Sequence, residues 1–256
     1  MIGILDSGLG GLSVLNDINH LMPKQSLCYV GDSASCPYGS KSYEKIQERV
    51  TTIVDFLISQ GAEIIVIACN SATIACVEAL RSVYPIPIIG MEPGVKPAAQ
   101  ITKTGKIGVF ATEVSLAGAK FHKLVSNHAQ GVEVITQPCP KFVTLVEKGS
   151  LRGNNVESAI REYTEPMLAR NVDTIVLGCT HYPFLKPEIE RLYPNLQIID
   201  TGKAVAKQTG RKTRDLTESI ETSHSFFTSS NSAEASELLY KLSPQFKPLK
   251  FQILPQ

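Results

Sequence analysis

Short apolar runs rich in β-branched residues alternate along the chain with segments of helical periodicity. Eight such runs predict buried strands, at residues 2–5, 27–30, 64–68, 86–89, 107–110, 132–135, 174–177 and 196–199. Between them, apolar residues recur at steps of three and four, as one face of a helix requires: Tyr43, Ile46, Val50, Ile53, Val54 and Leu57. This alternation predicts parallel sheets covered by helices.

The strand and helix pattern weakens after about Thr201. A stretch rich in Ser, Thr and Asn follows at residues 222–232, and a helix is predicted at residues 233–242.

A weak internal repeat divides the chain. Residues 62–71, AEIIVIACNS, align with residues 172–181, VDTIVLGCTH, at an offset of 110. Residues 2–5, IGIL, align with residues 107–110, IGVF, at an offset of 105. The repeat predicts an α/β fold of two similar doubly wound parallel-sheet domains, with the active site in the crevice between them.

Length, charge and termini exclude several classes of protein. At roughly 150 residues per domain, 256 residues make one to two domains. Lys and Arg number 25 against 24 Asp and Glu, so nucleic acid is not an expected partner. The longest apolar run, residues 64–69, is too short to cross a bilayer, and we expect no membrane partner. The first residues, MIGILD, carry no export signal, which favours a cytoplasmic location.

Six cysteines are present and none forms a CxxC pair, which disfavours a zinc site and a thioredoxin-like motif. Free cysteines are usually small buried residues, and this interpretation is kept for Cys28, Cys36, Cys76 and Cys139. Cys69 and Cys179 differ, because each directly follows a strand of the repeat and precedes a predicted helix. Ligands of open α/β sheets bind at this end of the strands.

The chemistry of a thiol changes at such a position. The positive end of a helix lowers the pKa of a thiol, so that it can act as a base, and the free N–H groups bind carboxylates. Inverting a tetrahedral carbon without a cofactor needs one group that removes a proton and another that delivers one to the opposite face. If the two halves face each other, Cys69 and Cys179 would flank one ligand in this way.

Further polar residues follow the other strands. Asp6-Ser7-Gly8 ends the first strand, and Gly31-Asp32-Ser33 ends the second and leads to Pro37-Tyr38-Gly39. Glu147 ends a short helical pattern, and His181 stands two residues from Cys179. Taken alone, such residues are more often caps, turns or surface residues than parts of a site.

Four motifs together carry a resemblance to a known family. They are Asp6-Ser7-Gly8-Leu9-Gly10-Gly11, Gly31-Asp32-Ser33 through Pro37-Tyr38-Gly39, Ala68-Cys69-Asn70-Ser71-Ala72, and Leu177-Gly178-Cys179-Thr180-His181-Tyr182-Pro183. In this order, over nearly the whole chain, they resemble the glutamate racemases of the cofactor-independent aspartate/glutamate racemase superfamily.

The resemblance implies interconversion of L- and D-glutamate, supplying D-glutamate for peptidoglycan, with no pyridoxal phosphate and no metal. It implies that Cys69 and Cys179 are the acid/base thiols and that Asp6, Glu147 and His181 assist them. The implied substrate contacts are Asp6, Ser7, Tyr38, Gly39, Asn70, Ser71, Thr180 and His181. It also implies a homodimer and two domains, residues 1–95 with 205–256 and residues 96–204.

The chain departs from the family pattern in places. The family commonly has Asp-Thr/Ser-Ala-Arg before Pro-Tyr-Gly, whereas Ser35 and Cys36 precede Pro37 here, and the absence of this arginine bears on loop packing and ligand affinity. Ser71 stands where many members have Thr, which preserves the hydroxyl group. The chain starts at its first predicted strand, so we expect no site for the peptidoglycan-precursor activator that some members bind through an N-terminal extension.

Three alternatives stay open at this point. An aspartate racemase would share the two-thiol mechanism and differ in pocket length. A dinucleotide loop at Gly8-Leu9-Gly10-Gly11 is disfavoured, since the final small residue of GxGxxG is missing. A non-catalytic amino-acid-binding module would have no need of the paired thiols.

Overall fold

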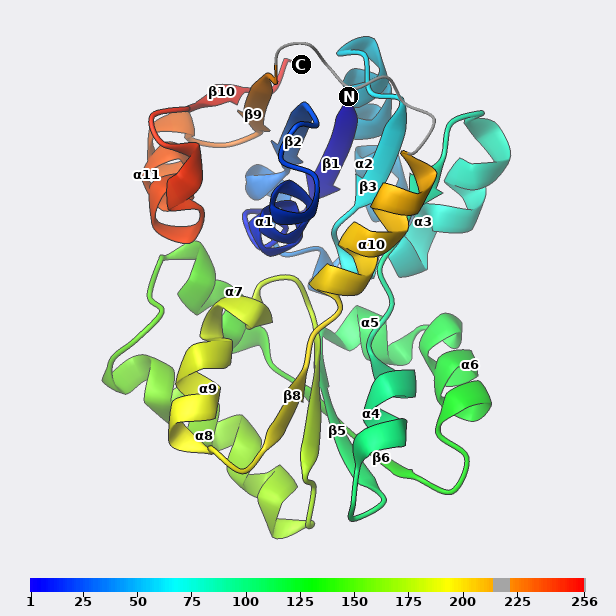
Figure 1. The fold of residues 1–256 in the computed structure, drawn as a ribbon, viewed down its shortest axis with the longest axis vertical. Helices are drawn as coiled ribbons and strands as arrows, with labels where there is room; N and C mark the ends of the chain where they lie inside the picture. Colours follow the sequence, from blue (N-terminus) through cyan, green and yellow to red (C-terminus); the bar gives the residue numbers. More distant parts are fainter. Residues whose placement is uncertain (214–221, 256) are drawn as a thin grey trace. The chain divides into compact units, whose positions relative to one another are not determined.

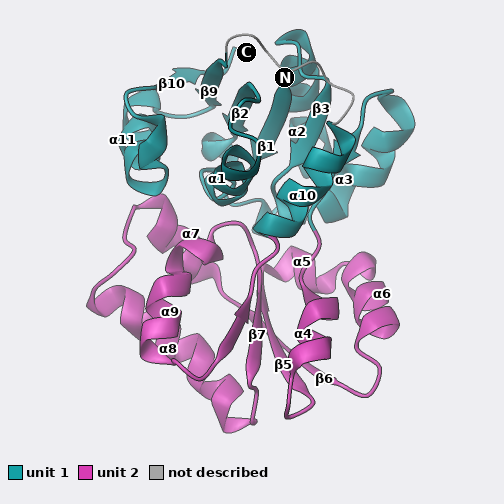
Figure 2. Cartoon of the chain, viewed as in Figure 1, with its two compact units in different colours: residues 1–91, 202–256 teal, residues 92–201 magenta. Residues whose placement is uncertain are grey.

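The chain is described from a computed structural model, which covers residues 1–213 and 222–255. It forms two compact units, Met1–Met91 with Gly202–Gln256 and Glu92–Thr201, drawn in two colours in Figure 2. The sequence predicts domain boundaries after residues 95 and 204. In the structure the two units divide after residues 91 and 201. The predicted C-terminal part of the first domain includes residues 214–221 and 256, which lie outside the described residues.

Unit 1 is built on a six-stranded parallel sheet with the order β10-β9-β2-β1-β3-β4. The strands are β1 (Ile2–Asp6), β2 (Leu27–Gly31), β3 (Ile64–Ile67), β4 (Ile88–Ile89), β9 (His224–Thr228) and β10 (Phe251–Ile253). The helices are α1 (Leu12–Leu21), α2 (Tyr43–Ser59), α3 (Asn70–Val83), α10 (Gly202–Lys212) and α11 (Ser232–Leu242). Helix α1 packs against α10 and α11, and α2 packs against α3, so the sheet has a helical layer on each face (Figure 1).

Unit 2 contains a four-stranded parallel sheet with the order β6-β5-β7-β8. The strands are β5 (Lys106–Ala111), β6 (Glu133–Pro138), β7 (Thr174–Gly178) and β8 (Gln197–Ile199). The helices are α4 (Val95–Ile101), α5 (Glu113–Ala117), α6 (Ala119–His128), α7 (Pro140–Glu147), α8 (Asn154–Ala169) and α9 (Lys186–Leu192). Helix α6 packs against α4 and α5, while α8 packs against α7 and α9.

The two sheets share a four-strand core with the same order and register. The order β2-β1-β3-β4 in unit 1 corresponds to β6-β5-β7-β8 in unit 2. Gly3 pairs with Ile65 in unit 1, and Gly108 pairs with Ile175 in unit 2, which are the positions that the sequence offsets of 105 and 110 relate. The internal repeat of the sequence is therefore a repeat of structure.

Close packing explains the glycine that both copies keep in the central strand. A Cβ on Gly3 would lie 2.9 Å from both Ala62 and Ile65. A Cβ on Gly108 would meet Val172 and Ile175, the repeat partners of those residues, at 3.4 and 3.2 Å. The central strand of each sheet is therefore tightly packed at this glycine, more tightly at Gly3 than at Gly108.

The turn that follows the long helix is also repeated. Gly61 after α2 and Asn171 after α8 occupy equivalent positions and both have positive φ, 90° and 63°. The next residue in each copy donates its N–H back into the helix, from Ala62 to Leu57 at 3.0 Å and from Val172 to Met167 at 3.1 Å. Glycine and asparagine are the residues that most readily adopt this left-handed conformation at a helix end.

All eight strands predicted from the hydrophobic pattern are present, within one to three residues at their ends, and α11 confirms the predicted C-terminal helix. Strands β9 and β10 were not predicted. Strand β9 lies inside the stretch rich in Ser and Thr, and β10 has three residues. On α2 the predicted buried face is confirmed except for Tyr43, which is exposed at the first turn.

Across residues 1–213 and 222–255, no helix has both the length and the apolar character to cross a membrane.

Candidate active site

The residues predicted for the site fall into two groups at the carboxyl ends of strands. The group in unit 1, called the Cys69 half-site, consists of Asp6, Ser7, Tyr38, Gly39, Cys69, Asn70 and Ser71. The group in unit 2, called the Cys179 half-site, consists of Glu147, Cys179, Thr180 and His181. Parallel strands place their following loops at one end of the sheet, which is why residues far apart in the sequence gather in each group.

Cys69 lies between β3 and α3 and caps the helix. Its backbone is extended, and its Sγ accepts the N–H of Ala72 at 3.5 Å. The Oγ of Ser7, after β1, lies 3.8 Å from the same sulfur. The thiol is buried at the N-terminus of a 14-residue helix, whose dipole and N–H groups favour a negative charge there. This confirms the predicted position of Cys69 at a helix start.

Asn70 is the best candidate for a direct ligand contact in this half-site. It is 3 % exposed, and neither its amide nitrogen nor its amide oxygen has a hydrogen-bond partner within the described residues. Buried amide groups are normally paired, because leaving them unpaired costs about 1–3 kcal/mol. A ligand with both a donor and an acceptor, such as an amino acid, would satisfy both atoms.

Asp6 shapes the glycine-rich loop after β1. Its Oδ2 accepts the N–H of Gly11 at 2.9 Å and that of Gly8 at 3.3 Å. The hydroxyl of Tyr29 donates to the carbonyl of Gly8 at 2.7 Å. A Cβ on Gly11 would lie 2.6 Å from the Cβ of Asp6, so the close turn requires glycine at this position. Asp6 therefore holds the loop that carries Ser7 toward Cys69.

Tyr38 forms the wall of the Cys69 half-site. It belongs to a short 3-10 turn (Tyr38–Ser40) that packs against α3, and its ring is buried. Its hydroxyl donates to Oδ2 of Asp32 at 2.7 Å. Burial raises the pKa of Tyr38 far above its usual value, and the charges of Asp32 and Cys69 add to this. The phenol therefore stays protonated and acts as a donor.

Cys179 follows β7, but it does not begin an α-helix. Its carbonyl accepts the N–H of Tyr182 at 3.1 Å, and a 3-10 turn (Tyr182–Leu185) separates it from α9. The prediction that both thiols start helices is therefore wrong for Cys179. Pro183 lies in the first turn of the 3-10 segment.

His181 takes the place of a helix dipole beside Cys179. The Nδ1 of His181 lies 3.6 Å from the Sγ of Cys179, and its Nε2 lies 2.6 Å from Oε1 of Glu147. His181 is 2 % exposed, and Glu147, the last residue of α7, is half-buried. With the ionised Glu147 accepting the Nε2 proton, Nδ1 is left as an acceptor toward the thiol. His181 can then take the proton of Cys179 and stabilise the thiolate.

Two neighbours of Cys179 stay neutral. Burial raises the pKa of the Cys139 thiol well above its usual range, and the charge of Cys179 is the second cause. The same two causes raise the pKa of Tyr182, whose hydroxyl donates to the carbonyl of Cys139 at 3.1 Å. Cys28 and Cys76 are also buried, as expected for structural thiols, whereas Cys36 is only half-buried.

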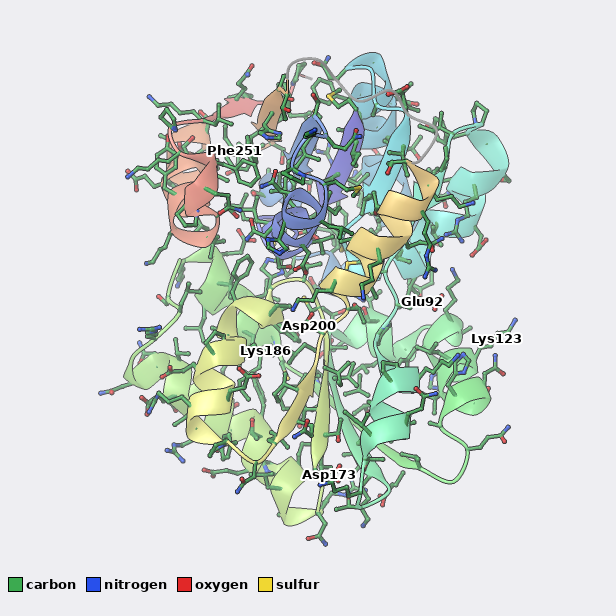
Figure 3. The ribbon with its side chains drawn as sticks, in the orientation of Figure 1. Glu92, Lys123, Asp173, Lys186, Asp200 and Phe251 are labelled. Atoms are coloured by element: carbon green, nitrogen blue, oxygen red, sulfur yellow. The ribbon has the colours of Figure 1, made fainter. Side chains whose placement is uncertain are left out.

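A well-bound carboxylate, that of Asp173, lies in unit 2 just before strand β7. It accepts the backbone N–H groups of Lys103 and Thr104 at 2.6 and 3.0 Å and the hydroxyl of Thr102 at 2.6 Å. Figure 3 shows Asp173 at the lower end of unit 2, whereas the ion pair between Lys186 and Asp200, 2.9 Å long, lies at the upper end. Asp173 therefore stabilises a loop remote from Cys179.

Sequence reasoning missed two residues, Arg49 and Ser229, that connect to the Cys69 half-site through Asp32. Both bind Asp32, Arg49 through Nε at 2.9 Å and Nη2 at 2.7 Å, and Ser229 through Oγ at 2.6 Å. Arg49 had a detectable signal, since it follows Ile46 by three residues and precedes Ile53 by four, on the buried face of α2. Ser229 had none, because it lies at the end of a strand that was not predicted.

The chain matches the family model described as Asp/Glu/Hydantoin racemase over residues 2–209. The chain belongs to this racemase family. It is 51 % identical over 212 residues to the glutamate racemase of Ectopseudomonas mendocina, covering 82 % of this chain and 81 % of the relative.

Solved structures of the racemase family agree with this membership. Glutamate racemase isoform RacE1 of Bacillus anthracis aligns with a TM-score of 0.89 and 31 % identity, over 100 % of this chain and 97 % of that one. The Escherichia coli glutamate racemase, in complex with L-glutamate and the activator UDP-MurNAc-Ala, aligns with a TM-score of 0.86 and 30 % identity, over 99 % and 96 %. The chain is thus an amino-acid racemase of two parallel-sheet α/β units.

Proposed function

We propose that this racemase interconverts L- and D-glutamate without a cofactor, with Cys69 and Cys179 as the two acid/base groups. The observation that carries the proposal is the placement of a thiol after the equivalent strand in each copy of the repeat. Relatives that share about half of the sequence are named glutamate racemases, which supports glutamate as the substrate.

In the proposed reaction, both half-sites act on one substrate. The thiolate of one cysteine removes the proton from Cα, leaving a carbanion, and the thiol of the other delivers a proton to the opposite face. The reverse reaction exchanges these roles, so one sulfur must be charged and the other neutral at the start of each direction. The pair would titrate as a unit rather than as two independent thiols.

Each thiol has its own means of carrying charge. The N-terminus of α3 and Ser7 stabilise the thiolate of Cys69. At Cys179, His181 accepts the proton and Glu147 holds the imidazole in the required orientation. Asp6 assists from the glycine loop, whose shape it maintains.

The proposed substrate contacts share a position at the carboxyl ends of the strands. They are Asp6, Ser7, Tyr38, Gly39, Asn70, Ser71, Thr180 and His181. The amide of Asn70 is the best placed of these, because its donor and acceptor lack partners among the described residues. Backbone N–H groups at the start of α3 would bind a carboxylate of the substrate.

The biological setting follows from the proposed reaction. The product D-glutamate would serve peptidoglycan synthesis, and the enzyme would work in the cytoplasm as a homodimer. Size-exclusion chromatography with light scattering tests the dimer, which a monomeric mass at micromolar protein would contradict.

Four amino acids given separately to the purified enzyme test the proposed substrate. We expect L- and D-glutamate to reach the same racemic end point, followed by circular dichroism, while L- and D-aspartate react at least about a hundredfold more slowly. Faster reaction of the aspartates would indicate an aspartate racemase. Binding of glutamate without any racemisation would indicate an amino-acid-binding module.

A further inference from the structure

A buried carboxylate, Asp32, lies at the centre of four hydrogen bonds behind the Cys69 half-site. Its Oδ1 accepts from Nη2 of Arg49 at 2.7 Å and from the hydroxyl of Ser229 at 2.6 Å. Its Oδ2 accepts from Nε of Arg49 at 2.9 Å and from the hydroxyl of Tyr38 at 2.7 Å. The three partners come from α2, from the segment after β9 and from the turn before α2, so the carboxylate joins three separate parts of unit 1.

The charge at this position is compensated within the described structure. Asp32 is fully buried, and Arg49 binds it through two parallel N–H groups, the geometry in which arginine is strongest. Burial alone would raise the pKa of Asp32, but the hydrogen bonds of Arg49, Ser229 and Tyr38 outweigh it and lower the pKa below the usual value. Ser35 and Cys36 have no cationic side chain, and the cation that binds Asp32 comes from α2.

Ser229 fixes both ends of the loop after β2. Its backbone N–H donates to the carbonyl of Gly31 at 3.2 Å, and its Oγ accepts the N–H of Ala34 at 3.0 Å while donating to Asp32. The family model ends at residue 209, so Ser229 lies in a part of the chain beyond the family match. A segment outside the family-model match therefore reaches the loop that carries Tyr38.

Tyr38 connects this network to the reaction site. Its turn packs against α3, which Cys69 caps, and the charge of Cys69 contributes to the raised pKa of Tyr38. The hydrogen bond from its hydroxyl to Asp32 fixes Tyr38, and with it Gly39, the next residue, in the turn that packs against α3.

We propose that Ser229 and Arg49 are positioning residues: through Asp32 they hold Tyr38 and Gly39 against Cys69 for substrate binding. The proposal rests on the proposed racemase function for its kinetic consequence. Its structural consequence, the shielding of Cys69 by Tyr38, is independent of that function.

Kinetics of Ser229→Ala and Arg49→Gln give the first test. Losing a hydrogen bond to a buried charge should raise KM for both glutamate enantiomers about tenfold, while kcat changes less than about threefold. Ser229→Thr keeps the hydroxyl and should restore KM to within about threefold of the parent. A purely structural role would instead lower the active fraction, which reduces the apparent kcat and leaves KM unchanged, and that result would overturn the proposal.

Alkylation by iodoacetamide, followed at each cysteine by mass spectrometry, gives the second test. Ser229→Ala and Arg49→Gln should speed alkylation of Cys69 at least about threefold and leave Cys179, in the other unit, unchanged. Equal changes at both thiols, or none at either, would contradict the proposal. This test holds even for an enzyme that fails to racemise glutamate, so failure of the function and failure of the inference are distinguishable.

Matched controls lie beside each substituted residue. Ser230 is exposed and adjacent to Ser229, and Lys45 forms an exposed ion pair with Glu48 on the same helix as Arg49. Ser230→Ala and Lys45→Gln should leave KM and both alkylation rates unchanged. All variants are measured at a temperature at which circular dichroism shows each to be folded.

Discussion

The two half-sites occupy equivalent positions in a structural repeat, yet they handle the thiol differently. Cys69 caps a 14-residue α-helix and lies beside a serine hydroxyl. Cys179 precedes only a 3-10 turn and is contacted by a histidine that a glutamate orients. One backbone plan therefore surrounds the thiol with different groups, the N-terminus of a helix at Cys69 and an imidazole at Cys179, and the proposed mechanism uses both.

The half-sites differ in the kind of support that surrounds each thiol. Helix N–H groups supply a fixed partial charge, whereas a neutral imidazole can accept a proton from a thiol. Substitutions should therefore distinguish the two half-sites. Their expected effects range from loss of racemisation to small changes in the free energy of unfolding.

Loss of either thiol should have the largest effect. Cys69→Ser and Cys179→Ser each replace a group that transfers the Cα proton in the proposed mechanism, and each should lower the rate of racemisation about a thousandfold or more. The rate is measured by circular dichroism with both enantiomers. Cys76→Ser and Cys139→Ser, in the same two units, should retain activity within about threefold. A Cys69→Ser or Cys179→Ser enzyme with full activity would refute the two-thiol mechanism.

Substitutions in the His181–Glu147 pair should affect one half-site only. His181→Asn removes the proton acceptor of Cys179 and should lower kcat about a hundredfold, and Glu147→Gln, which keeps the size of the side chain, about tenfold. Both should slow alkylation of Cys179 while Cys69 keeps its rate. Equal slowing of the two thiols would show that the pair does not act on Cys179 alone.

The two well-bound carboxylates, the buried Asp32 and the half-buried Asp173, should differ in their effects at pH 7. Asp32→Asn leaves Arg49 without its partner, should lower the free energy of unfolding by about 3 kcal/mol and should raise KM for glutamate. Asp173→Asn, just before strand β7 in unit 2, should lower the free energy of unfolding less than Asp32→Asn and leave activity unchanged. Urea unfolding and steady-state kinetics measure the two quantities.

The pH dependence of stability gives a further check on Asp32. Its pKa is lower in the folded protein than in the unfolded chain, so its contribution is complete above the unfolded value of about 4 and is lost as the pH falls through the folded value. The stability difference between the parent and Asp32→Asn should therefore shrink from about pH 5 downward. A difference that grew with acidity would contradict this assignment.

The smallest expected effects compare the equivalent glycines of the central strands. Gly3→Ala brings a Cβ within 2.9 Å of the rigid Cβ of Ala62 and should lower the free energy of unfolding by about 1–3 kcal/mol. In Gly108→Ala the added Cβ lies 3.2 Å from its nearest neighbour, Ile175. This substitution should lower the free energy of unfolding by less than about 1 kcal/mol. Thermal unfolding compares them, and a larger loss for Gly108→Ala would contradict the packing difference.

The hydrophobic pattern predicted much of this structure because buried parallel strands have a strong local signature. All eight predicted strands exist, and the repeat of the sequence matches the register of the sheets. Strands β9 and β10 escaped prediction because β9 begins with His224 and Ser225 in a polar stretch and β10 is short. Strand β9 pairs with β2 and β10 pairs with β9, so both extend a sheet whose other strands carry the stronger signature.

The site was predictable where topology decides it and unpredictable where side chains from distant segments meet. Cys69 and Cys179 follow strands, so their positions follow from the strand pattern. The contact between His181 and Glu147 depends on how α7 packs, and the resemblance to a known family, rather than any local pattern, suggested it. Ser229 reaches Asp32 across nearly 200 residues of sequence, a pairing that no local pattern encodes.

Racemisation in deuterium oxide tests the central claim most directly. Each glutamate enantiomer is converted to a few per cent by the parent enzyme, and the deuterium at Cα is measured by mass spectrometry in product and in recovered substrate. Two thiols on opposite faces predict a product that carries solvent deuterium and a substrate that still carries protium, in both directions. A product that retains its original proton would show transfer by a single group and contradict the account.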